Sequence, residues 1–171
     1  ELRKYTDENT RIALTEAGKM AYWTKGKKLD LVGLNTTEIA KKGLKYKNIE
    51  NFNPQIIFLH TIGTIKVSSC KEKDFKKISY NELSNSRTIY SINWREIYEP
   101  AMRAPGAAIE YILKQNNFEV YLLCFLGAYS HLIAFSDEEI ISKTQLLEIL
   151  ESIKDDKTNL SYLEMSNLIN N

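Results

Sequence analysis

The 171-residue sequence has no long hydrophobic run, no strong excess of either charge and only two cysteines. Its most apolar stretch, residues 120–126, has the length of a strand, whereas a membrane-spanning helix needs roughly 20 apolar residues. The 23 basic and 22 acidic residues leave a formal charge of +1, which excludes a strong electrostatic attraction to nucleic acid. We therefore expect a chain that does not itself cross a bilayer and does not bind nucleic acid.

Metal and cofactor motifs are also missing. Cys70 and Cys124 belong to no CxxC pair, and the only histidines, His60 and His131, are far apart in the sequence. Neither a GxGxxG nor a GxxxxGK[ST] sequence occurs, so phosphate binding by a glycine-rich loop is not indicated. The sequence predicts no metal and no cofactor, and it leaves open whether Cys70 and Cys124 form a disulfide.

The composition is that of a globular protein, with 43% hydrophobic and 26% charged residues. No internal repeat and no linker rich in proline or glycine divides the chain, which predicts one domain over residues 1–171. The first residue is Glu1 rather than Met, and no leader follows it. We therefore expect a segment upstream of Glu1 to have been removed, so that this domain is part of a longer protein.

Strands and helices alternate in the first half of the predicted structure, and the second half contains a hairpin. A strand–helix–strand order predicts parallel pairing, and two strands joined near Gly127 predict an antiparallel pair. The expected fold is a three-layer α/β sandwich with a mixed, partly parallel sheet and helices on both faces. Pro105 is expected at the start of a helix, and residues 61–87 are ambiguous. The predicted strands are 11–15, 28–32, 55–60, 118–125 and 129–135, and the predicted helices are 35–42, 91–102, 107–115, 142–154 and 161–169.

The first predicted helix follows Gly33. Asn35, Thr36, Thr37 and Glu38 have the spacing of a capping box, in which the Asn35 side chain would accept a hydrogen bond from the first turn. A helix that begins here would also present free N–H groups to an anion. A purely structural role, in which Asn35 serves only as a helix cap, is favoured over an anion-binding site.

Four residues with useful chemistry fall at or near the ends of predicted strands: Glu16, Asp30, Asn35 and His60. Since the carboxyl ends of neighbouring parallel strands share one edge of a sheet, these residues are candidates for a ligand-binding site there. No catalytic residue is assigned among them.

Three of the four candidates also have a structural interpretation. Asn35 caps its own helix, Asp30 forms an ion pair with an arginine such as Arg11 or Arg103, and His60 packs against a helix that covers the sheet. An ion pair is favoured for Asp30, because a carboxylate inside a strand is costly to bury alone.

One stretch of sequence resembles a known family. Glu16-Ala17-Gly18, Tyr22-Trp23, the run from Asp30 to Asn35 (DLVGLN) and the run from Asn53 to Ile57 (NPQII) follow one another in an order typical of bacterial GT-C glycosyltransferases. The chain resembles the extracytoplasmic C-terminal domain of these polytopic membrane proteins, which are related to dolichyl-phosphate-mannose-protein mannosyltransferases. The resemblance covers about residues 11–60.

The resemblance implies a parent protein in the bacterial inner membrane, with this domain on the periplasmic or extracytoplasmic side. Such a parent uses a lipid-linked sugar, and its catalytic carboxylates lie on a loop near the first membrane helices, outside this chain. The leading hypothesis is therefore a non-catalytic, soluble, monomeric domain that contacts the acceptor, the sugar donor or a partner. One alternative is a free-standing α/β hydrolase or transferase that uses strand-end acidic residues and His60. The other is a protein-interaction module that docks through residues 161–169.

Overall fold

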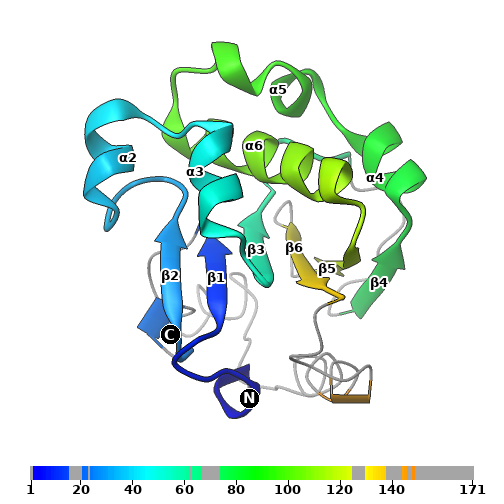
Figure 1. Ribbon diagram of the computed structural model, residues 1–171. Coiled ribbons are helices and arrows are strands. Elements are labelled where there is room, and N and C mark those ends of the chain that lie inside the picture. Colours follow the sequence, from blue (N-terminus) through cyan, green and yellow to red (C-terminus); the bar gives the residue numbers. More distant parts are fainter. Residues whose placement is uncertain are drawn as a thin grey trace, which may run out of the picture.

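A six-stranded sheet with helices packed against it forms the molecule (Figure 1). The computed structural model describes residues 2–15, 21–22, 24–61, 63–66, 74–124, 130–137, 144–145 and 148. In chain order the elements are η1 (Leu2–Tyr5), β1 (Arg11–Leu14), β2 (Lys27–Asp30), α2 (Thr37–Lys42), α3 (Tyr46–Phe52), β3 (Ile56–His60), β4 (Asp74–Ile78), α4 (Tyr80–Ser86), α5 (Ile89–Ile92), η2 (Trp94–Glu96), α6 (Pro100–Gln115), β5 (Phe118–Cys124) and β6 (Ser130–Ser136).

The sheet has a parallel half and an antiparallel half. The strand order is β2-β1-β3-β6-β5-β4, in which β1 runs parallel to both β2 and β3. The strands β6, β5 and β4 then follow as antiparallel neighbours, beginning with the pair between β3 and β6. The predicted parallel strands and the predicted hairpin are confirmed, and so is an α/β sandwich with a mixed, partly parallel sheet.

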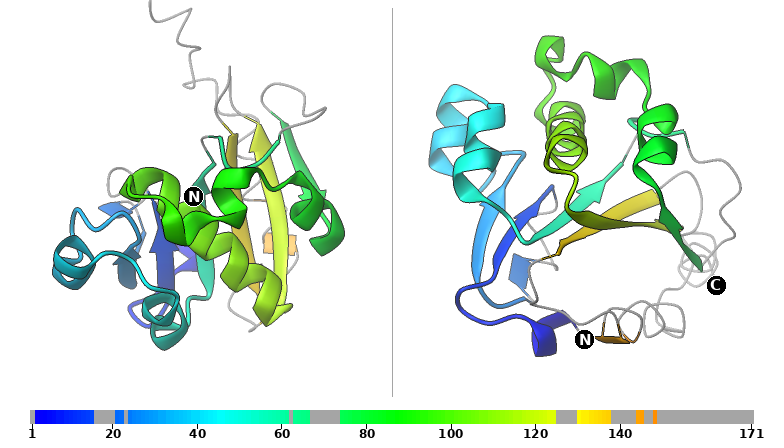
Figure 2. Two further views of the ribbon diagram at one scale, coloured as in Figure 1. Left: turned by 90° about the horizontal axis from the view of Figure 1, so that it is seen from above. Right: turned by 45° about the vertical axis from the view of Figure 1, so that its right-hand side comes forward.

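The layers are visible in three orientations. The helices α2 to α6 lie over one face of the sheet, with α6 running along it (Figures 1 and 2). At the opposite face lies η1, whose Tyr5 packs against the sheet and donates a hydrogen bond from its hydroxyl to Glu148 Oε2 at 3.1 Å. Within the described ranges, no helix combines the length and apolarity needed to span a membrane.

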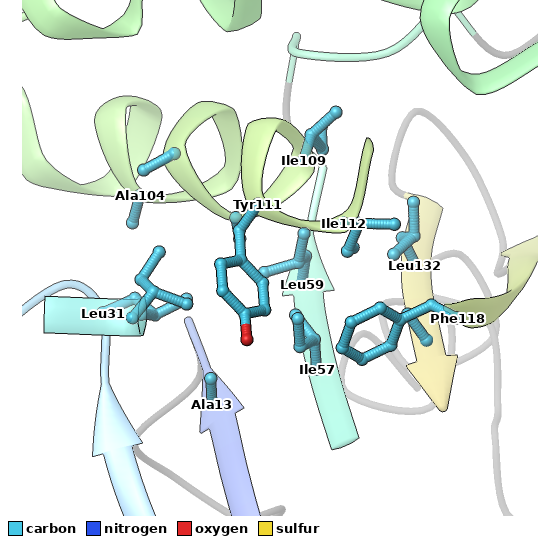
Figure 3. Close-up of a cluster of buried hydrophobic side chains, with 14 of the residues drawn as sticks. Ala13, Leu31, Ile57, Leu59, Ala104, Ile109, Tyr111, Ile112, Phe118 and Leu132 are labelled. Carbon is cyan, nitrogen blue, oxygen red and sulfur yellow. The ribbon is translucent and has the colours of Figure 1, made fainter. Parts of the chain in front are cut away.

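The helix-covered face holds the larger core. Because successive strand residues point to opposite faces, Ala13, Ile57 and Leu59 meet α6, whose Ile109 and Ile112 are fully buried (Figure 3). Burial of side chains of this size stabilises the fold by roughly 1.5–3 kcal/mol each. The alternation of apolar residues in the strands therefore fixes which strand residues face α6.

A second, smaller core lies on the other face. It gathers the alternate strand residues, which are buried to 93% or more: Ile12, Leu14, Ile56, Phe58, Tyr121, Leu123, Ile133 and Phe135. Since both faces of the central strands are buried, β3 and β6 are apolar almost throughout, as strands buried on both sides are expected to be.

Several local predictions differ from the structure. Pro105, which was expected at the start of a helix, lies inside α6, and Pro100 stands in the first turn of that helix. Pro100 suits this place because its missing N–H is unpaired there in any helix. The ambiguous residues 61–87 contain the edge strand β4 and the helix α4. The predicted helices 142–154 and 161–169 lie almost entirely outside the described residues, as does Cys70.

Candidate functional site

Asp30, the last residue of β2, is the centre of a turn that leads into α2. Its side chain is 96% buried, and its carboxylate accepts three backbone hydrogen bonds. Oδ1 accepts from the N–H groups of Val32 at 3.0 Å and Gly33 at 3.1 Å, and Oδ2 accepts from the N–H of Asn35 at 2.7 Å. A buried carboxylate is tolerated where backbone donors surround it in this way. Asp30 therefore holds residues 31–35 in a fixed loop.

The predicted ion pair between Asp30 and an arginine is wrong. Among the described residues, Asp30 has no salt bridge. Arg11 instead donates from Nε to the carbonyl oxygen of Asn53 at 2.6 Å, and the Arg103 guanidinium lies 5.6 Å from the ring centroid of Trp94. The backbone N–H groups of the loop, and not an arginine, stabilise the Asp30 carboxylate.

The capping role of Asn35 is also wrong. The residue before α2 is Thr36, and no side chain caps this helix. The Thr36 hydroxyl accepts a hydrogen bond from the Asp30 N–H at 3.1 Å, while the Asn35 side chain is exposed. Because Asp30 draws the Asn35 N–H toward the turn, the helix begins one residue later than the capping-box pattern predicts.

Gly33 makes this turn possible. Its φ is +95°, a value that residues with a Cβ seldom adopt, and an added Cβ would lie 2.9 Å from Ala40 N. The close approach of the turn to the first residues of α2 thus requires glycine. Gly43 closes the same helix with φ +71°, and its N–H donates to Ile39 O at 2.8 Å.

His60 ends β3 and stacks on a second histidine. His60 and His131 are partners across β3 and β6, and their rings lie nearly parallel, 4.6 Å apart at an angle of 3°. Phe58 stacks on His131 at 5.2 Å. Since Phe58 belongs to the smaller core, the pair lies on the face away from α2 to α6, so His60 does not pack against these helices.

Burial and the nearby charge of His60 lower the pKa of His131 to about 4. The imidazole of His131 is therefore neutral at physiological pH. This pair was not predicted, because the two histidines are 71 positions apart in the sequence and only the strand order β3-β6 brings them together. The sequence held one signal for this contact: His60 lies at the end of one predicted strand and His131 near the start of another, so the two would face each other if these strands paired antiparallel.

Two of the four predicted site residues end the two strands that lie on either side of β1, at one edge of the sheet. Asp30 and His60 flank the end of β1, where Thr15 Oγ1 accepts a hydrogen bond from the His60 N–H at 2.7 Å. Two strand spacings, about 10 Å, separate their backbones. Asn35 lies in the loop after Asp30, and Glu16 lies outside the described residues.

A polar cluster on α6 was not predicted. Glu110 accepts hydrogen bonds from Trp94 Nε1 at 2.6 Å, Arg95 Nη2 at 2.8 Å and Lys114 Nζ at 2.7 Å. Partial burial opposes ionisation of Glu110, but these three donors together hold its pKa at about 2. The i,i+4 spacing of Glu110 and Lys114 was a detectable signal, whereas the contacts to η2 depend on tertiary packing. The cluster fastens η2 to α6.

Across the described part of the chain, no three histidine, cysteine, aspartate or glutamate side chains are grouped so that they could hold a metal ion. The arrangement at the sheet edge is therefore a rigid turn on Asp30 beside a stacked histidine pair, with Thr15 between the two strands that carry them. Such an edge offers polar backbone and side-chain groups to a ligand.

The fold and its strand ends define an α/β domain with a mixed sheet. The chain belongs to the family described as "Domain of unknown function (DUF8728)", whose model matches residues 1–121. This match includes Asp30, Asn35 and His60 and stops within β5, before His131. No curated protein and no solved structure matches the chain.

Proposed function

We propose that this chain is a non-catalytic binding domain of a larger membrane protein of the GT-C glycosyltransferase type, in which it contacts the acceptor, the sugar donor or a partner. The parent lies in the bacterial inner membrane, with this domain on its periplasmic or extracytoplasmic side. The observation that carries the proposal is the hydrogen bonding of Asp30. Both oxygens of this carboxylate accept backbone N–H groups, so they fix a loop.

The loop on Asp30 presents groups that a ligand can contact. Leu34 and Asn35 project from it as exposed side chains, and their backbone is held by the Asp30 carboxylate and by Gly33. A rigid loop at the carboxyl ends of parallel strands is where α/β domains commonly bind ligands. The DLVGLN sequence that resembles the GT-C domains is this loop.

A free-standing hydrolase or transferase is the weaker candidate. An acid–base pair of Asp30 and His60 would need their side chains within hydrogen-bond reach, roughly 3 Å. Their backbones lie two strands apart, and the Asp30 oxygens are already engaged. These contacts support binding over acid–base catalysis.

Two observations test the proposal. The reading frame that contains this chain should encode many hydrophobic spans and an acidic loop near the first of them. Purified residues 1–171 should not transfer sugar from a lipid-linked donor. Turnover by the purified chain, or a reading frame without hydrophobic spans, would overturn the proposal.

A further inference from the structure

One strand pair joins the two halves of the sheet. The parallel strands β2, β1 and β3 meet the antiparallel strands β6, β5 and β4 where β3 lies beside β6, and we call this strand pair the seam (Figure 1). His60 and His131 are the last partners of the seam at the carboxyl end of β3. Next to them, the N–H and the hydroxyl of Thr61 both donate to the carbonyl oxygen of Ser130, at 3.1 Å and 2.8 Å. The stacked histidines therefore lie beside the hydrogen bonds that close one end of the seam.

The geometry of the two rings makes this end of the seam sensitive to charge. The ring centroids are 4.6 Å apart and the planes are 3° from parallel, so the faces of the two imidazoles are in contact. Two neutral rings, or one neutral and one protonated ring, can stack in this way, whereas two protonated rings repel each other. Water screens this repulsion poorly, because Thr61 and Ser130 beside the pair are buried and Phe58 stacks on His131 at 5.2 Å.

The other titratable groups on this face of the sheet have partners of their own in the part of the chain that the structure describes. They are Tyr5, bonded to Glu148, Asp30, bonded to the N–H groups of its loop, and Tyr121, bonded to Glu119, which also pairs with Lys77. Burial first, and the charge of His60 second, lower the pKa of His131 to about 4. Protonation of one ring therefore acts directly on the other.

We propose that the stacked pair of His60 and His131 is an acid-sensitive latch on the seam. With no more than one ring protonated, the stack holds the carboxyl end of β3 against the start of β6. When both rings are protonated they separate, and the hydrogen bonds between Thr61 and Ser130 open while the rest of the seam stays paired. The opening lies at the sheet edge where β2 delivers the loop on Asp30. The latch does not depend on the proposed function, since it follows from the contacts of the two rings.

The test is amide hydrogen exchange of the chain, followed by NMR at pH 7 and pH 4.5 and corrected for the intrinsic effect of pH. The Thr61 N–H crosses the seam beside the histidines and should lose protection by at least about tenfold. A released ring with an ordinary pKa near 6.5 favours the open state by up to about tenfold for each pH unit below that value.

Dilute urea separates local opening from unfolding of the whole chain. Exchange of the Thr61 N–H at pH 4.5 should not change with urea, because local opening exposes little surface. The Ser136 N–H, which donates to Gln55 O at 2.9 Å at the opposite end of the seam, is the internal control. Its exchange should rise with urea, because it follows unfolding of the whole chain.

Two variants separate the latch from the burial of His131 alone. His60→Phe keeps a stacked ring but removes one charge, so the pKa of His131 should rise by roughly half a unit or more, and the pH effect on Thr61 should shrink about threefold or more. Glu82→Gln, at an exposed site on α4, is the matched control and should change neither value.

Three results would overturn the inference. The first is equal protection of the Thr61 N–H at pH 7 and pH 4.5. The second is an undiminished pH effect in His60→Phe, which would assign the effect to the burial of His131 alone. The third is an equal urea dependence of exchange at Thr61 and Ser136, which would show that this end of the seam opens only when the whole chain unfolds.

Discussion

Replacement of Asp30 tests whether its carboxylate anchors the turn. In Asp30→Ala three N–H groups lose their acceptor: that of Gly33 is buried, that of Val32 is half-buried and that of Asn35 lies next to solvent. A hydrogen bond to a charged group contributes about 1.5–3 kcal/mol, and water can replace the bonds nearest the surface. We therefore expect Asp30→Ala to lower the free energy of unfolding by about 3 kcal/mol.

Asn35→Ala is the matched comparison. Its side chain is exposed and caps no helix, so we expect a change of less than about 0.5 kcal/mol, whereas loss of a real cap would cost about 0.5–2 kcal/mol. Urea unfolding measures both variants. With a slope of about 2 kcal/mol per molar, Asp30→Ala should shift the midpoint by about 1.5 M and Asn35→Ala by about 0.2 M or less.

If the two variants lose similar stability, Asn35 acts as the cap after all. If Asp30→Ala unfolds at the same urea concentration as the unchanged chain, the Asp30 carboxylate does not anchor the turn. Asp30→Asn should fall between these values, since the amide keeps one acceptor oxygen and loses the other.

Three further predictions concern other contacts. In the folded chain the pKa of His131 lies below its ordinary value of 6.5, so protonation of this ring disfavours the folded state. The contribution of the neutral ring to the free energy of unfolding is complete above pH 6.5 and is lost, by about 3 kcal/mol in all, as the pH falls toward 4. Unfolding of His131→Gln measured across this pH range should lack this loss. Glu110→Ala strands the buried Trp94 N–H and should cost about 2–3 kcal/mol in thermal unfolding, whereas the same change at the exposed Glu82, whose partners are Lys76 and Ser79, should cost less. Gly106→Ala should separate residues 88–98, which include α5 and η2, from α6, since the added Cβ meets Trp94, and should increase amide exchange in these residues; unchanged exchange there would contradict the packing.

The mixed sheet was predictable because its strands carry local signals. The strands near residues 11–15, 55–60, 118–125 and 129–135 are short apolar runs bounded by turn residues, and the strand–helix–strand order dictates parallel pairing. The edge strand β4 was not predicted, because DFKKI has only two apolar residues and its pairing with β5 supplies the rest of its order.

The site was only partly predictable, because its contacts combine local and distant partners. The residue types of Asp30 and His60 and their positions at strand ends follow from the sequence. The hydrogen-bond partners of Asp30 do not follow from the sequence, since a carboxylate at a strand end can accept hydrogen bonds either from an arginine or from the N–H groups of a loop. In this chain the loop supplies the donors, because Gly33 allows the chain to fold back over the carboxylate. The stacking of His60 on His131 depends on β6 lying beside β3.

The most direct test of the proposed function is an NMR titration of ¹⁵N-labelled residues 1–171 with a lipid-linked sugar donor and then with an acceptor saccharide. We expect at least one of these ligands to shift the amide signals of the loop at Leu34 and Asn35, while the ligand signals show no new product. The appearance of transferred or hydrolysed sugar, abolished in His60→Ala, would contradict a non-catalytic binding role.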